Sequence, residues 1–141
     1  MKKTLSIVAF LTLIISATFA QKGPIATFTT TEMNYGTIEK GANPLRIFEF
    51  KNTGKEPLII KNAKGSCGCT VPTYPKEPIM PGQISKIEVR YDTQRVGPFT
   101  KTITLTTNEE NETRVLMIKG DVKPEGGAAK ENTAVKATPK G

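Results

Sequence analysis

Two cysteines separated by one glycine are the residues of this chain with the clearest chemical potential. Cys67 and Cys69 are the only cysteines in 141 residues, and they lie in the segment GSCGCT at 65–70. Such a pair could form a disulfide, chelate a soft metal ion, take part in thiol–disulfide exchange, or pack as two small apolar side chains. Which of these chemistries is available depends on the compartment in which the chain folds.

The first 20 residues predict export. Lys2 and Lys3 precede an apolar stretch at 7–15, and the small residue Ala20 ends the segment. This is the pattern of a secretory signal peptide cleaved before Gln21, and its apolar stretch is too short for a membrane span. We therefore expect a periplasmic or secreted protein whose cysteines meet an oxidising environment. Loss of the two lysines lowers the formal charge from +7 to +5.

The spacing of the cysteines predicts a weak disulfide, if one forms. Residues two apart in a regular strand place their Cβ atoms much farther apart than the roughly 3.8 Å that a disulfide prefers. A bond would need a tight turn, which Gly68 is expected to permit. Closing so small a loop stabilises a fold by only about 1.6 kcal/mol in the chain-entropy model. A Cys67–Cys69 bond is therefore expected to be labile.

Other site chemistries find few residues in this sequence. Two thiolates could hold Cu(I) with help from Met33, Met80 or Met117. However, the chain has no histidine, so a Ser–His or Cys–His pair cannot form, and a four-ligand zinc site would need carboxylates. We predict no catalytic residue, no metal and no cofactor. Asp92, Asp121 and the glutamates are interpreted as solvated charges at strand ends, in hairpin loops and in the tail.

Seven segments show the alternation of short β-strands. They are rich in β-branched and aromatic residues and end at Gly, Pro, Asn or Asp. The clearest is 84–91, where apolar and charged side chains alternate. The expected strands are 25–30, 35–38, 45–52, 57–62, 84–91, 100–107 and 113–122.

The fold class predicted from these strands is an all-β, immunoglobulin-like antiparallel β-sandwich of about seven strands. We place this domain at 21–122, after the signal peptide at 1–20. The segment 123–141 has few large apolar residues and is predicted to be a disordered tail.

Four prolines recur every third residue after the cysteines. Pro72, Pro75, Pro78 and Pro81 would share one ridge of a polyproline II helix, which suits a ligand for an aromatic groove. The favoured interpretation is an extended crossover from one sheet to the other, followed by a turn at 81–82. We take Gly68, Thr70, Tyr74 and these prolines as a candidate binding loop beside the cysteines.

The sequence also resembles a known family. The segments NYGTI at 34–38, FEFKNTGKEPLII at 48–60, GSCGCTVPTYPKEPIMPGQ at 65–83 and IKGDV at 118–122 are similar to the exported bacterial domain-of-unknown-function family 1573. This family is related to Hydin-type and major-sperm-protein-like immunoglobulin sandwiches. The resemblance covers 25–122 and implies a sandwich of seven or eight strands and export to the cell envelope. It implies no established activity.

Two functional hypotheses remain. The leading one is a non-catalytic binding or scaffolding module of the envelope, whose partner is an unknown protein or envelope component. Its lysines and arginines are scattered without interleaved aromatics, so we expect no nucleic-acid partner. The alternative is a thiol-redox or Cu(I)-binding protein that uses the Cys-Gly-Cys loop.

Overall fold

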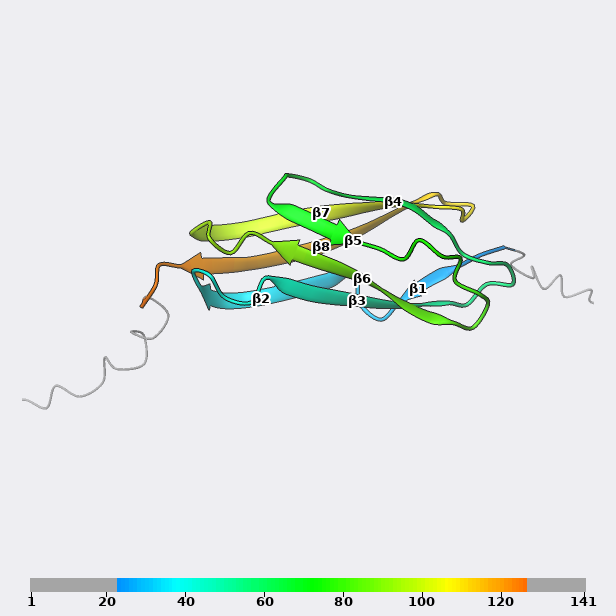
Figure 1. Ribbon diagram of the computed structural model, residues 1–141, viewed down its shortest axis with the longest axis horizontal. Coiled ribbons are helices and arrows are strands. Elements are labelled where there is room, and N and C mark those ends of the chain that lie inside the picture. The colour runs from blue at the N-terminus through cyan, green and yellow to red at the C-terminus, as the bar shows by residue number, and fades with distance from the viewer. Residues whose placement is uncertain (1–22, 127–141) are drawn as a thin grey trace, which may run out of the picture.

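The computed structural model describes residues 23–126, which form eight strands in two four-stranded sheets (Figure 1). The first sheet has the order β1-β3-β6-β5 and the second has the order β2-β8-β7-β4. The predicted signal peptide and residues 127–141 of the predicted tail lie outside these residues, and Lys123, the first residue of that tail, ends β8. The strands are β1 (Ala26–Phe28), β2 (Glu32–Glu39), β3 (Leu45–Asn52), β4 (Ile60–Gly65), β5 (Thr70–Thr73), β6 (Ile84–Tyr91), β7 (Gly97–Thr107) and β8 (Thr113–Lys123).

The predicted all-β sandwich is confirmed, with two differences of detail. β3 and β6 have the predicted bounds, and they pair in antiparallel register from Leu45↔Arg90 to Lys51↔Ile84. An additional strand, β5, was not predicted. β2 runs parallel to β8 with a register shift between Asn34 and Thr37, whereas the remaining pairs are antiparallel. Strand direction is a property of the chain path, so the alternation of side chains could not show it.

The core lies between the sheets and is built from alternate residues of the long strands. Successive side chains of a strand point to opposite faces, so one face of each sheet is apolar. These side chains are almost completely removed from water, and burying one of this size stabilises the fold by about 1.5–3 kcal/mol. The innermost ones are Phe48, Phe50, Ile87, Val89, Ile103, Leu105, Leu116, Ile118 and Val122, together with Leu58, which precedes β4.

The proline segment does not cross between the sheets, contrary to the prediction. It connects β5 to β6, which belong to the same sheet. Pro72 lies within β5, and Ile79 pairs with Leu58 through two N–H···O bonds of 2.8 Å. The four prolines therefore do not form one uninterrupted polyproline II helix. The turn after them is confirmed: the Gln83 N–H donates to the Met80 carbonyl, and Gly82 has a φ of +82°, as in a type II turn.

The interpretation of all glutamates as solvated charges is wrong for Glu109. This residue, in the β7–β8 hairpin, is only 4% exposed. Its carboxylate accepts hydrogen bonds from Nε and Nη2 of Arg114 (3.1 and 2.7 Å), the Ala26 N–H (2.9 Å) and the Thr107 hydroxyl (3.0 Å). Burial raises the pKa of the Glu109 carboxyl, but these hydrogen bonds and the charge of Arg114 outweigh it and lower the pKa below its usual value. The hairpin is thereby joined to the start of β1.

Within residues 23–126, no helix is long and apolar enough to cross a bilayer.

Candidate functional site

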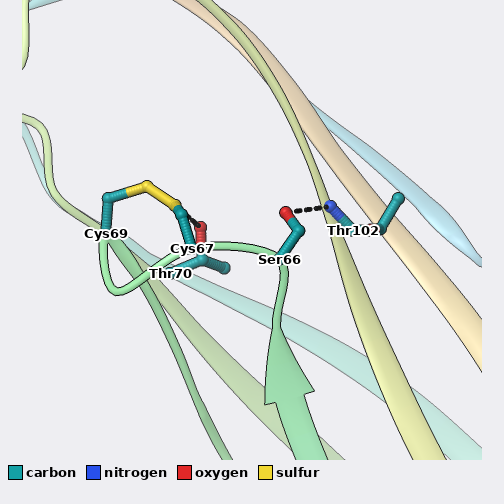
Figure 2. Close-up of a disulfide and its surroundings, with 5 residues drawn as sticks. All are labelled: Ser66, Cys67, Cys69, Thr70 and Thr102. Atoms are coloured by element: carbon teal, nitrogen blue, oxygen red, sulfur yellow. Dashed lines mark hydrogen bonds between the residues drawn. A yellow bond between two sulfur atoms is a disulfide. The ribbon is translucent and has the colours of Figure 1, made fainter.

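The Cys-Gly-Cys segment is one of the connections at which the chain crosses from one sheet to the other. β4 belongs to the second sheet and β5 to the first, and only residues 66–69 connect them. Ser66 still pairs with β7: its N–H donates to the Thr102 carbonyl (2.8 Å), and its Oγ accepts from the Thr102 N–H (3.2 Å). After Ser66 the chain turns away from β7 (Figure 2). The cysteines therefore lie where the chain changes sheets, at one edge of the sandwich.

The two cysteines form a disulfide across a four-residue turn. The Thr70 N–H donates to the Cys67 carbonyl (3.2 Å), and the two cysteine Cα atoms are 5.2 Å apart, within the usual range for a disulfide. Cys69 is buried and its carbonyl accepts from the Asp92 N–H (2.8 Å), while Cys67 is half-buried. Of the chemistries left open by the sequence, the structure contains the disulfide.

The glycine that makes this crossover possible is not the one expected. Gly68 has a negative φ, and a Cβ atom added there would meet no atom within 4 Å. A Cβ atom added to Gly65 would instead lie 2.2 Å from the Thr70 carbonyl oxygen. Real Cβ atoms do not approach a carbonyl so closely. Gly65 therefore allows the end of β4 to contact the start of β5, and the turn needs no glycine between the cysteines.

One open depression lies on the loop side of the disulfide. It has a volume of about 380 Å³, and its lining includes Pro44, Cys69, Val71 and Arg90. It is formed by the loops around residues 41–44, 68–69 and 92–94. Two main-chain hydrogen bonds join these segments: the Tyr91 N–H donates to the Pro44 carbonyl (3.1 Å), and the Asp92 N–H donates to the Cys69 carbonyl. Such bonds between loops favour a preformed surface.

An aromatic cluster supports the same loops from inside. The ring of Tyr35 packs edge-on against those of Tyr91 and Phe99, and its hydroxyl donates to the Pro44 carbonyl (2.6 Å). The Arg46 guanidinium lies 3.8 Å above the Tyr35 ring. Burial raises the pKa of Tyr35 and is partly offset by Arg46. The floor of the loop cluster is thus part of the core.

A second open depression lies between the edges of the two sheets; we call it the β4–β5 seam. Its volume is about 430 Å³, and it is lined by Ala63, Lys64, Cys67, Val71 and Pro72 together with the crossover main chain. Val71 lines both depressions and is 55% exposed. The disulfide is therefore the wall between two concave surfaces.

The predicted binding residues do not all share one surface. Gly68 is exposed at the turn, whereas Thr70 is 3% exposed and points inward, with its hydroxyl near both sulfur atoms (3.7 and 3.8 Å). Tyr74 is half-buried, and its hydroxyl donates to the Lys61 carbonyl (3.4 Å). Of the predicted prolines, Pro72 and Pro75 are half-buried, while Pro78 and Pro81 are exposed.

Copper binding gains no additional ligands from the fold. Within residues 23–126, no group of three or more His, Cys, Asp or Glu side chains could hold a metal ion. Met33 lies in β2, Met117 lies in β8, and Met80 precedes the Pro81 turn, whereas both cysteines lie at the crossover. The arrangement gives no support to the redox or Cu(I) alternative beyond the presence of the disulfide.

Sequence reasoning missed Val71 and the main-chain edge of β4. Both depend on which strands lie at the sheet edges, and the pairing of β5 with β6 decides that. The alternation in TVPT at 70–73 was the only available signal, and Pro72 obscured it because proline is uncommon in strands.

Comparison with known proteins identifies a family and a fold. A family model described as "Protein of unknown function (DUF1573)" matches residues 26–122. The comparison with curated proteins gives no match.

Similar solved structures include a protein of unknown function from Porphyromonas gingivalis W83 (TM-score 0.64, 17% identity, 77% of this chain and 51% of that chain). Another is the ASH/PapD-like domain 7 of human CEP192 (TM-score 0.58, 9% identity, 86% and 99%). A third is a chain of the CsuC–CsuE chaperone–tip adhesion subunit pre-assembly complex of Acinetobacter baumannii (TM-score 0.51, 10% identity, 70% and 57%). This chain therefore spans about half the length of the first and third structures, and the likeness shows a PapD-like, immunoglobulin-type sandwich.

Proposed function

We propose a function on the premise that this chain belongs to the family described as protein of unknown function (DUF1573), whose model spans the whole sandwich. We infer that it is an exported, non-catalytic binding module that captures a protein or envelope component at the crossover corner. This corner comprises the Cys67–Cys69 turn, Val71 and the two depressions beside them.

The observation that carries this proposal is the joint exposure and rigidity of the corner. Val71 is an apolar side chain that is 55% exposed between two concave surfaces. The main chain beneath it is fixed by the disulfide and by the hydrogen bond from Asp92 to Cys69. A surface that is already ordered loses little conformational entropy when it binds a partner.

Export is supported by the leader pattern at 1–20 and by the disulfide. Disulfides form and persist in oxidising compartments and are rare in the cytosol. We propose the periplasm or the exterior as the place of action. One chain of similar fold belongs to the CsuC–CsuE chaperone–tip adhesion subunit pre-assembly complex, and a protein partner for this chain is consistent with that use of the fold.

Site-specific photo-cross-linking in the native cells tests the proposal. A photoreactive amino acid is placed at Val71 and, as a matched control, at Val115, which is 53% exposed on the outer face of the other sheet. We expect a discrete cross-linked product from position 71 and none from position 115. Equal products from both positions, or none from position 71, would refute the proposed surface.

A further inference from the structure

The two strands that border the β4–β5 seam present different main-chain groups to it. Because Ser66 directs its N–H toward β7, and main-chain groups alternate along a strand, Ala63 and Gly65 direct theirs away from β7 and toward the seam. The Lys61 carbonyl also points there, since it accepts the Tyr74 hydroxyl. The free edge of β4 therefore offers both a donor and acceptors at Lys61–Lys64.

The facing edge of β5 has no free donor. The Cys69 carbonyl accepts a hydrogen bond from the Asp92 N–H just after β6. Because main-chain groups alternate along a strand, those of Val71 and Thr73 point toward β6, while those of Thr70 and Pro72 point toward the seam. The Thr70 N–H is already bonded to the Cys67 carbonyl, and proline has no N–H. A strand approaching from this side can therefore pair with β4 but not with β5.

We propose that the seam receives an extended segment of the partner as an additional strand beside β4. This inference rests on the proposed function and specifies how the partner binds. The segment spans Lys61–Lys64, a length of about 10 Å at roughly 3.4 Å per residue, and it ends before Gly65, which already contacts the Thr70 carbonyl. Its inward side chains contact Ala63, Cys67 and Pro72, all of which line the seam.

The charges beside the seam select the outward side chains of this segment. Lys64 shares the outer face of its sheet with Thr104, and Lys76 lies 3.4 Å above the Tyr74 ring. Neither lysine forms an ion pair within the part of the chain that the structure describes. Lys61 pairs with Glu112, but both side chains are about half exposed, and such pairs contribute little. The expected segment alternates small apolar residues with acidic ones.

A second copy of this chain is a poor occupant of the same edge. Pairing β4 with β4 of another copy would bring Lys61 and Lys64 of both chains together, and like charges across a strand pair are destabilising. Lysines at sheet edges discourage such self-pairing in general. The seam thus favours an acidic segment over its own edge.

Tyr74 occupies part of the proposed path. Its hydroxyl bond to the Lys61 carbonyl is long (3.4 Å) and exposed, so an incoming main-chain N–H can replace it. Replacing Tyr74 by Phe keeps the ring but removes the hydroxyl that competes for the Lys61 carbonyl. We therefore expect the inserted segment to bind more tightly to this variant.

The test uses the full exported chain and two synthetic peptides with capped ends, one of sequence Glu-Val-Glu-Val-Glu and one of sequence Lys-Val-Lys-Val-Lys. We expect saturable binding of the acidic peptide, at least tenfold tighter than that of the basic one, and at least tenfold slower hydrogen exchange of the Ala63 amide in the complex. Tyr74→Phe should tighten binding two- to threefold. Lys64→Ala should weaken it, while Lys86→Ala, on the other sheet, should not.

Ala63→Pro removes the donor and should weaken binding at least tenfold, with a thermal unfolding curve to show that the variant folds. If Ala63→Pro does not fold, Tyr74→Phe and the Ala63 exchange rate decide the matter. Unchanged exchange at Ala63 in the complex, equal binding of both peptides, or no binding would overturn the inserted strand. If the cross-link from position 71 persists unchanged in Ala63→Pro, the partner binds at the corner without inserting a strand, and the proposed function stands alone.

Discussion

Replacing Glu109 by Gln should destabilise the fold far more than an ordinary loop substitution. The carboxylate is 4% exposed and accepts four hydrogen bonds, two of them from Arg114. Removing one partner of a buried ion pair costs about 3–5 kcal/mol. The Arg114 side chain is 39% exposed and can turn to solvent, and Gln can still accept one or two of the bonds. We therefore expect a loss at the low end, about 3 kcal/mol.

The acid dependence gives this prediction a second readout. The pKa of Glu109 is lowered in the folded chain, and an unfolded glutamate has a pKa of about 4.3. Its contribution to stability is therefore complete above that value and is lost as the pH falls through the lower folded pKa. The difference in unfolding free energy between the wild type and Glu109→Gln should be constant near neutral pH and should shrink below about pH 4.

Urea unfolding at several pH values measures both effects. Glu112→Gln in the same hairpin is the matched control, because the Glu112 side chain is 63% exposed and its pairing with Lys61 is worth less than about 1 kcal/mol. A loss below about 1 kcal/mol for Glu109→Gln would refute the reasoning, since the burial and hydrogen bonds described here require several times more. So would a difference from the wild type that grows in acid.

Two further predictions concern the crossover. Gly65→Ala should lower the unfolding free energy by at least about 2 kcal/mol, because the added Cβ would overlap the Thr70 carbonyl. Gly68→Ala should change it by less than about 0.5 kcal/mol. Similar losses for both variants would contradict the conclusion that Gly65 is the constrained glycine. Replacing Cys67 and Cys69 together by Ser should lower the unfolding free energy by no more than about 1.6 kcal/mol, since the closed loop is so short. Loss of the sandwich circular-dichroism spectrum in that double variant would show that the disulfide is essential to the fold.

Local alternation was sufficient to predict the central strands. Phe48 and Phe50 in 45–52, and Ile87, Val89 and Tyr91 in 84–91, stand at alternate positions. These side chains are the buried apolar ones on the inner faces of β3 and β6. The turn at Pro81-Gly82 was equally predictable, because glycine supplies the positive φ that its type requires. In these segments the conformation favoured by the local sequence is the same as the one that the folded structure requires.

The cysteine site was predictable in composition but not in position. The Cys-Gly-Cys spacing identified the residues that could bond, yet the crossover was expected in the proline segment that follows. Which loop changes sheets depends on the partner of β5, and the four residues of TVPT pair with β6 through main-chain atoms that carry no sequence signature. For the same reason, Gly65 rather than Gly68 proved to be the constrained glycine.

The sequence by itself determined the alternation of apolar side chains, the turn chemistry and the presence of one cysteine pair. All of these depend on neighbouring residues, so they can be interpreted locally. The tertiary structure alone decided that β2 runs parallel to β8, that one glutamate of the hairpin is buried while its neighbours are exposed, and that the free edge of β4 faces the disulfide. These features arise from contacts between residues distant in the chain, and one sequence does not reveal which distant segments meet.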